Sequence, residues 1–261
     1  MTLFAPGLLD GRIAVVTGGG SGIGRATALE LASLGCQVAV LGRRAETLDE
    51  TVARAEGAGR VSSYPVDVRE PEQVETVLDR IGADLGAVDT LVNNAGGQFV
   101  SPAEGISLNG FRAVTRLNLD AVWNLTTSVA NRWMVAAGYG KVVSVVISPR
   151  RAMPGMAHSA AARAGVENMT RTMAVEWGRY GIRLNCVAPG IIHTEAWERY
   201  GLAPEAVAAA IPAGTLGTAE DVAHAITYLV SSAGDYVTGA TLLVDGGLDN
   251  TGPGAAWSRS D

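Results

Sequence analysis

Short runs of β-branched and other apolar residues alternate along the chain with longer segments in which apolar residues recur every three or four positions. The short runs are bounded by residues such as Gly and Asn and are typical of buried strands, whereas the longer segments are typical of amphipathic helices. The predicted strands are residues 13–17, 37–41, 61–66, 90–93, 141–147, 183–188 and 242–244. The predicted helices are residues 22–34, 45–56, 72–83, 108–137, 219–231 and a long one that begins near residue 157.

The alternation of strand and helix predicts βαβ crossovers and a seven-stranded parallel sheet with helices on both faces, an α/β fold. No shift of composition divides the chain, so we expect one domain over residues 1–249. Residues 190–217 are long and irregular, with one short helical piece near 204–210, as expected of a lid over a site. Residues 250–261 are rich in Gly, Pro and Ser and are expected to form a flexible tail.

Composition and charge exclude several classes of protein. The formal net charge of -6 over 261 residues, without a long basic run, argues against a nucleic-acid partner. No apolar segment has the length of a membrane span, and the first residues lack the pattern of a signal peptide. Cys36 and Cys186 are far apart and have no metal-ligand spacing, so we expect buried thiols. His158, His193 and His224 are scattered, and no metal site is predicted. We therefore expect a cytoplasmic protein without a membrane partner.

A glycine cluster lies between the first predicted strand and its helix, in the order Thr17-Gly18-Gly19-Gly20-Ser21-Gly22-Ile23-Gly24. Glycines at this place allow a tight turn and a close approach of the backbone to a pyrophosphate, which then rests on the N-terminus of the helix. The position directly after a strand predicts a Rossmann fold that binds a dinucleotide. The contacting residues are expected to be Gly18, Ser21, Gly22, Ile23 and Gly24.

The end of the second strand carries Gly42-Arg43-Arg44. A carboxylate at this place would hold the ribose hydroxyls of NAD, whereas guanidinium groups suit the 2′-phosphate of NADP. We therefore predict NADPH as the cofactor, with Arg43 and Arg44 as its phosphate ligands. In the alternative interpretation both arginines are solvated charges at the start of a helix.

Further cofactor contacts are expected where later strands end, because ligands bind at the carboxyl edge of an open α/β sheet. Asp67 and Val68, after the third strand, are expected beside the adenine. The loop after the fourth strand brings further residues to the same edge, namely Asn94, Ala95 and Gly96.

The chain resembles the short-chain dehydrogenase/reductase family over almost its full length. The matching pieces are the Thr17 to Gly24 loop, Asn93 to Gly96, Asn118, Pro189-Gly190 with Thr194, and Val244-Asp245-Gly246-Gly247. The resemblance implies that Asn118 belongs to the catalytic set. It implies cofactor contacts from Pro189, Gly190, Ile192 and Thr194. It also implies that the helices from about Leu108 and Ala157 pack across a dimer axis, in a homodimer or homotetramer.

Within the family the chain is similar to the peroxisomal trans-2-enoyl-CoA reductases and the neighbouring 2,4-dienoyl-CoA reductases. Residues 3–9, 97–104 and 158–165 carry this likeness. It implies an acyl thioester substrate, with CoA as the expected carrier. The C-terminus is not a peroxisomal Ser-Lys-Leu address, so the expected compartment is still the cytoplasm.

The chain departs from the family at the reaction centre. The family pattern has a tyrosine as acid/base and a lysine four residues on, and Ser159 and Arg163 stand at those positions. The spacing keeps both side chains on one helix face. However, a serine hydroxyl is a weaker acid than a tyrosine, and an arginine stays charged. The family's serine on the fifth strand falls on Ile147, with Ser148 adjacent, and the sequence does not decide between the two positions.

These replacements fit the reduction of a carbon-carbon double bond better than the reduction of a ketone. A ketone requires a tuned acid at its oxygen. An enoyl thioester first requires donors that stabilise an enolate oxygen. We therefore predict NADPH-dependent reduction of a trans-2-enoyl thioester, with Arg163 on the cofactor ribose and Ser159 and Ser148 as donors.

Two alternatives stay open. The first is a carbonyl or 3-ketoacyl reductase that uses another acid, for which His158 is a candidate, although a histidine at a helix start is more often structural. The second is a scaffold or sensor that binds NADP(H) without catalysis. In a separate alternative interpretation, Ser159 is a small residue that fills space beside the nicotinamide. Arg150-Arg151 could meet a substrate phosphate or be a solvated surface pair.

Overall fold

A computed structural model describes residues 3–57, 59–147, 152–194 and 203–251 of the chain. Its main feature is a seven-stranded sheet in the order β3-β2-β1-β4-β5-β6-β9, in which every neighbouring pair is parallel. The strands are β1 (Ile13–Thr17), β2 (Gln37–Gly42), β3 (Arg60–Pro65), β4 (Thr90–Asn93), β5 (Gly140–Val145), β6 (Ile182–Pro189) and β9 (Thr241–Val244). The predicted α/β Rossmann fold is confirmed.

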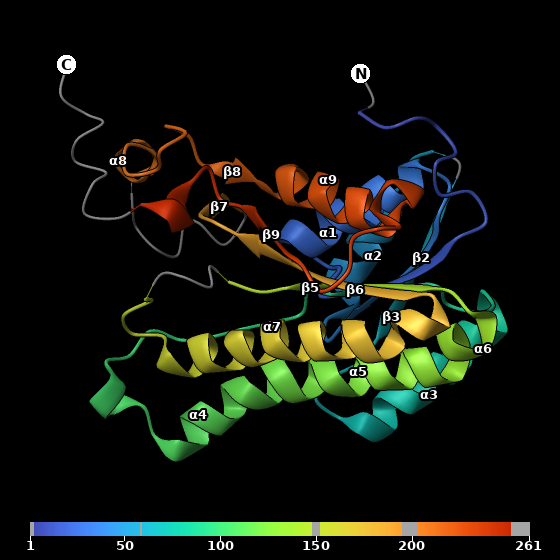
Figure 1. The fold of residues 1–261 in the computed structure, drawn as a ribbon, viewed down its shortest axis with the longest axis horizontal. Coiled ribbons are helices and arrows are strands. Elements are labelled where there is room, and N and C mark those ends of the chain that lie inside the picture. The colour runs from blue at the N-terminus through green and yellow to red at the C-terminus, as the bar shows by residue number, and fades with distance from the viewer. Residues whose placement is uncertain (1–2, 58, 148–151, 195–202, 252–261) are drawn as a thin grey trace.

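Helices cover both faces of the sheet (Figure 1). One face carries α1 (Gly22–Ser33), α2 (Ala45–Ala53) and α9 (Ala219–Val230), whose apolar side chains share one core layer. The other face carries α3 (Pro71–Asp84), α5 (Ala121–Val129) and α7 (Ala157–Trp177) over a second layer. Successive strand residues serve opposite layers, since Val15 belongs to the second and Val16 to the first. The sheet therefore separates two cores, as the near-continuous apolar strands predict.

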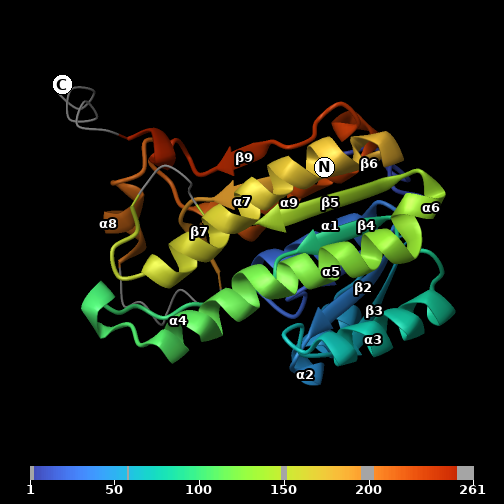
Figure 2. The same cartoon turned by 60° about the horizontal axis from the view of Figure 1, so that its bottom comes forward.

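The segment predicted as one helix over 108–137 is a continuous helical rod with two π-helical turns. It consists of α4 (Leu108–Thr115), η2 (Arg116–Asp120), α5, η3 (Ala130–Met134) and α6 (Val135–Ala137). The rod and α7 lie side by side, with α4 extending beyond the sheet (Figure 2). π-helical turns inside helices are rare and often mark functional positions. The turn η2 contains Asn118.

Several other predicted boundaries differ by a few residues. Strand β5 ends at Val145, before the predicted 147, and α2 ends at Ala53, before the predicted 56. A small second sheet of β7 (Ile192–His193) and β8 (Gly217–Thr218) was not predicted, because two-residue strands leave no periodic signal.

The remaining elements are short. Along the chain, α8 (Pro204–Ala208) lies between β7 and β8 and falls within the helical piece predicted near residues 204–210. Short 3₁₀ turns occur at η1 (Ala103–Gly105), η4 (Gly178–Tyr180), η6 (Ser232–Gly234) and η7 (Leu248–Asn250). Residues 252–261 of the predicted tail and 195–202 of the predicted lid lie outside the described residues.

Both cysteines are buried and free, as predicted. Burial raises the pKa of the Cys36 thiol to about 12 and that of Cys186 to about 11. Within the described ranges no helix is long and apolar enough to cross a membrane. The same ranges contain no group of three or more His, Cys, Asp or Glu side chains that could hold a metal ion.

Candidate active site

The glycine loop between β1 and α1 has a backbone that larger residues could not adopt. Gly18 and Gly22 have φ of +67° and +50°, in the left-handed region. A Cβ on Gly24 would lie 2.2 Å from the carbonyl oxygen of Gly18, so the first turn of α1 packs directly on the loop. Helix α1 begins after Ser21, with neither a side-chain cap nor an acidic residue in its first turn. Its first N–H groups therefore suit an anion such as a pyrophosphate.

The loop is held from the α2 side by residues that the sequence analysis did not single out. The buried Arg25 donates to the carbonyl oxygen of Gly20 at 2.5 Å and to the Thr51 hydroxyl at 3.1 Å. Thr51 in turn donates to the carbonyl oxygen of Gly19 at 2.9 Å. Because these carbonyl groups are bonded within the protein, the loop keeps its shape without a ligand.

The loop after β4 is joined to the glycine loop. The Thr17 hydroxyl oxygen accepts the N–H groups of Asn94 and Ala95 at 3.0 and 2.9 Å. The Asn94 side-chain amide donates to the carbonyl oxygen of Thr17 at 2.9 Å. The structure thus brings together two loops that the sequence places some 77 residues apart.

Asn118 connects this loop to α7. It is fully buried in the π turn η2, where its Oδ1 accepts the N–H of Gly97 at 3.0 Å. Its Nδ2 donates to the carbonyl oxygen of Gly97 at 3.1 Å and to the Ser159 hydroxyl oxygen at 3.4 Å. Ser159 is also buried, so two of the predicted catalytic residues are in contact.

Arg163 lies one turn along α7 from Ser159, with its guanidinium against the loop after β4. A Cβ on Gly96 would lie 2.0 Å from Arg163 Nη2, so the guanidinium occupies the space that this glycine leaves open. The residue is only 6% exposed, and its Nη1 has no hydrogen-bond partner. Burial lowers the pKa of Arg163 to about 10, which leaves it charged at neutral pH.

A buried cation with an unbonded nitrogen is costly unless a ligand completes it. The unbonded Nη1 of Arg163 therefore allows us to ask whether a dinucleotide would fit this edge of the sheet. The ribose hydroxyls of a nicotinamide dinucleotide are acceptors that would suit the unbonded Nη1. The anion-ready N-terminus of α1 suits the pyrophosphate of the same molecule. The residues present thus fit the cofactor.

His158 borders the same centre from the start of α7. It is fully buried, and its Nδ1 accepts the Ser159 backbone N–H at 2.7 Å. This bond leaves the ring proton of neutral His158 on Nε2, which has no partner. The Phe99 ring meets the imidazole edge-on, with 4.3 Å between ring centroids. Phe99 itself is 41% exposed, so the loop after β4 offers an apolar wall next to the centre.

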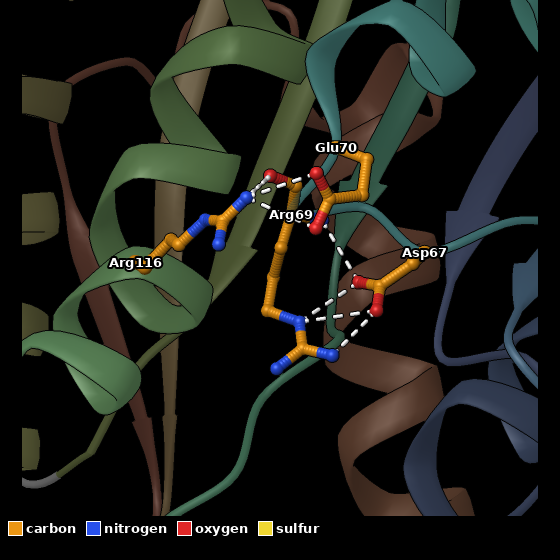
Figure 3. A network of polar contacts seen from close by, with 4 residues as sticks. All are labelled: Asp67, Arg69, Glu70 and Arg116. Carbon is orange, nitrogen blue, oxygen red and sulfur yellow. Dashed lines mark hydrogen bonds and ion pairs between the residues drawn. The ribbon is translucent and has the colours of Figure 1, made fainter. Parts of the chain in front are cut away.

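At the adenine end of the expected cofactor site, Arg43 and Arg44 are exposed. Neither forms an ion pair with a described residue. Asp67 is bound by Arg69, whose Nε and Nη2 donate to both carboxylate oxygens (Figure 3). These bonds lower the pKa of Asp67 to about 2. Val68 is buried in the core, so only its backbone could contact a ligand. Arg69 was not singled out in the sequence, because a side chain two residues beyond Asp67 gives no periodic signal.

The last expected cofactor residues follow β6. Pro189 ends that strand beside Val244, and Gly190 packs so closely on Asp245 that a Cβ there would lie 2.6 Å from its Cα. Ile192, in β7, pairs with Gly217. Thr194 approaches the glycine loop, because a Cβ on Gly22 would lie 3.5 Å from its Cγ2. The small sheet therefore places Thr194 over the start of α1.

Two predicted groups have no structural account. Ser148 and the Arg150-Arg151 pair lie outside the described residues, while Ile147 lies two residues beyond the end of β5. The structure thus brings together Asn118, Ser159 and Arg163, and leaves the position of the strand-five serine unassigned.

Comparisons with known proteins identify the family. The family described as enoyl-(acyl carrier protein) reductase matches residues 18–249. A probable 2,4-dienoyl-CoA reductase of Bacillus subtilis is 36% identical over 92% of this chain and 97% of its own. The chain belongs to the short-chain dehydrogenase/reductase family. It is thus an oxidoreductase of that type, whose fold implies binding of NAD(H) or NADP(H).

Other relatives within the family differ in the reactions their names give. A gluconate 5-dehydrogenase of Gluconobacter oxydans is 37% identical over 92% of this chain and 95% of its own. The solved structure of a citronellol catabolism dehydrogenase from Pseudomonas aeruginosa PAO1 is 43% identical, with a TM-score of 0.86, over 95% of this chain and 99% of its own. Membership of the family therefore leaves the substrate to be argued from the site.

Proposed function

We propose that this protein reduces the carbon-carbon double bond of a trans-2-enoyl thioester, with CoA as the carrier and NADPH as the cofactor. The observation that carries the proposal is the pair of Asn118 and Ser159 beside the unpartnered, buried Arg163. No tyrosine stands at the position expected of a carbonyl reductase, while hydroxyl, amide and guanidinium groups are present.

When bound, NADPH supplies the hydride, which is transferred to the β carbon of the enoyl group. The electron pair of the double bond then moves to the thioester oxygen as an enolate. The Ser159 oxygen already accepts from Asn118, so its own hydrogen is available to the enolate oxygen. Protonation of the α carbon, which we assign to water, completes the saturated thioester. In this series of steps Ser159 donates a hydrogen bond and does not transfer its proton.

Asn118 positions Ser159 and the loop after β4. Its amide bonds fix both backbone groups of Gly97, so the loop beside the reaction centre is set at a constant distance from α7. The charge of Arg163 would bind the ribose and favour the developing enolate. Both roles depend on groups that are in place before a ligand binds.

NADPH is the proposed cofactor because Arg43 and Arg44 are exposed at the end of β2 and have no ion-pair partner among the described residues. Guanidinium groups bind phosphate in a bidentate manner, and no carboxylate at this position would hold a ribose instead. We further propose a homodimer or homotetramer, and a lid over the site from residues 190–217 with a flexible tail after residue 250.

The test follows NADPH consumption with crotonyl-CoA and a longer trans-2-enoyl-CoA, beside acetoacetyl-CoA. We expect turnover of the enoyl thioesters, a lower rate with NADH, and an about hundredfold to thousandfold lower kcat in Ser159→Ala, as for loss of an oxyanion donor. Turnover of the ketone alone would overturn the proposal.

A second candidate function is carbonyl reduction with His158 as the acid. The observation that favours it is the buried, unpartnered Nε2 of this residue, one position before Ser159. It predicts ketone turnover that is lost in His158→Ala while NADPH still binds. A scaffold without catalysis would instead bind NADPH and turn over neither class of thioester.

A further inference from the structure

A network of polar contacts links the adenine end of the expected cofactor site to the helical rod that carries Asn118 (Figure 3). It consists of Asp67, Arg69, Glu70 and Arg116. The first three residues follow β3, and Arg116 is the first residue of the π turn η2. Asn118 is two residues further along the same turn.

Each link of the network is a direct contact. Arg69 Nε donates to the two carboxylate oxygens of Asp67 at 2.9 and 3.1 Å, and the Asp67 carboxylate also accepts the Arg69 N–H at 3.0 Å. Arg116 Nη2 donates to the carbonyl oxygen of Arg69 at 3.1 Å and to both carboxylate oxygens of Glu70 at 3.0 Å. The contacts therefore run without a gap from the Asp67 carboxylate to the Arg116 side chain of η2.

A second set of contacts joins the rod to helix α3, which begins after Glu70, at a place farther from Asn118. Arg132, in the other π turn η3, forms an ion pair with Glu75 at 2.6 Å and another with Asp79. Ser128 donates to Glu75 at 2.6 Å. Loss of the Arg116 contacts therefore leaves the rod attached to α3. The position of Arg116 next to Asn118 suggests a role beyond attachment.

We propose that Arg69 and Arg116 are positioning residues that connect the adenosine end of the cofactor site to Asn118, so that a ligand at Asp67 steadies the catalytic turn. The inference rests on the proposed function only for the identity of the cofactor and the role of Asn118. The readout is the backbone N–H of Gly97, which Asn118 holds at the opposite end of the site.

The test is amide hydrogen exchange at Gly97 with and without adenosine 2′-monophosphate, which fills the adenosine end and carries neither pyrophosphate nor nicotinamide. In the unaltered protein we expect slower exchange when this nucleotide is bound. In Arg116→Gln we expect the nucleotide to bind with unchanged affinity and to leave exchange at Gly97 unchanged. Arg116→Lys is expected to restore part of the effect.

Arg132→Gln is the matched control, since it removes ion pairs between the same rod and α3 without touching η2. We expect it to lower thermal stability and to keep the response at Gly97. With an enoyl thioester, Arg116→Gln is expected to lower kcat about two- to fivefold, in keeping with an exposed ion pair, at an unchanged KM.

The inference is overturned if bound nucleotide does not slow exchange at Gly97 in the unaltered protein, if Arg116→Gln retains the full response, or if Arg132→Gln loses it equally. A protein that shows the expected response but reduces no enoyl thioester would contradict the proposed function and support this inference.

Discussion

Arg163 combines three properties that are costly in a folded protein: a positive charge, near-complete burial and a nitrogen without a hydrogen-bond partner. A family lysine at this position could lose its charge more readily, because a buried ammonium shifts its pKa easily. Arg163 keeps its charge throughout the neutral range, so the role we propose for it is electrostatic attraction and not proton transfer.

This property predicts how cofactor affinity depends on pH. The pKa of Arg163 in the free protein is lowered to about 10, and only the protonated form attracts an electron-rich ribose. We expect the affinity for NADPH to be level between pH 7 and 9 and to fall as the pH rises through about 10. Fluorescence titration measures this, with circular dichroism to verify that the fold persists. Arg163→Gln should bind more weakly and show no break near pH 10, and a break of equal size in that variant would contradict the assignment.

At the scale of single residues, the sequence predicts which side chains share a helix face, but it does not predict the long-range contacts that hold the site in place. The four-residue spacing of Ser159 and Arg163 on one helix face is a local property, and the structure retains it. Arg25 acts through contacts that depend on how α1 and α2 pack. It reaches Thr51 across 26 residues of sequence. Such pairs carry no periodic or motif signal in a single chain.

At the scale of elements, the loop after β4 can pack against the Arg163 side chain of α7 because Gly96 has no side chain. Gly96 admits the guanidinium of Arg163, whereas the next residue, Gly97, has more room. A Cβ on Gly97 would meet its nearest heavy atom, in Leu117, at 3.4 Å. A side chain at position 96 would therefore displace Arg163, whereas a methyl group at position 97 would fit in the space present.

The difference gives a matched pair of variants. Gly96→Ala places its methyl group 2.0 Å from Arg163 Nη2, so the guanidinium must move, and we expect NADPH affinity to fall about tenfold or more. Gly97→Ala makes an ordinary contact and should change affinity little. Isothermal titration of both variants measures the effect. Equal losses in the two would indicate that flexibility of the loop, and not space for Arg163, explains the glycine.

The helical rod shows why the sequence does not predict every element boundary. Apolar periodicity over residues 108–137 predicts one helix, and the chain is indeed helical throughout. The π turns η2 and η3 insert extra residues without breaking the backbone bonding, so they leave the periodic pattern nearly unchanged. Their effect is geometric, because η2 places Asn118 in the interior while Arg116 contacts Arg69 and Glu70, which precede α3.

At the scale of the whole molecule, the parallel sheet brings the loops after β1, β2, β3, β4 and β6 to one edge. The pattern of strands and glycines is enough to predict this arrangement, since carboxyl ends of parallel strands meet at the same edge. The β7–β8 pair, which places Thr194 over α1, depends on two residues per strand and could not be read from periodicity.

A surface formed by α4, α5 and α7 predicts self-association. These neighbouring helices expose Leu108, Phe111, Trp123 and Val175, of which Val175 is 85% exposed. Large apolar side chains left exposed on neighbouring helices favour an interface between subunits. We expect a homodimer or homotetramer, and Val175→Glu should shift it toward smaller species in light scattering after gel filtration. Val175→Thr, which adds no charge, should shift it much less. Equal masses for Val175→Glu and the unaltered protein would contradict this interface.

The burial of the two thiols has a consequence because the proposed substrate is an electrophile. Enoyl thioesters are Michael acceptors, and the thiolate is the form of cysteine that adds to them. Cys36 and Cys186 are both inaccessible, and their pKa values of about 12 and 11 keep them protonated at neutral pH. We therefore expect neither Cys36 nor Cys186 to be alkylated by the proposed enoyl thioester.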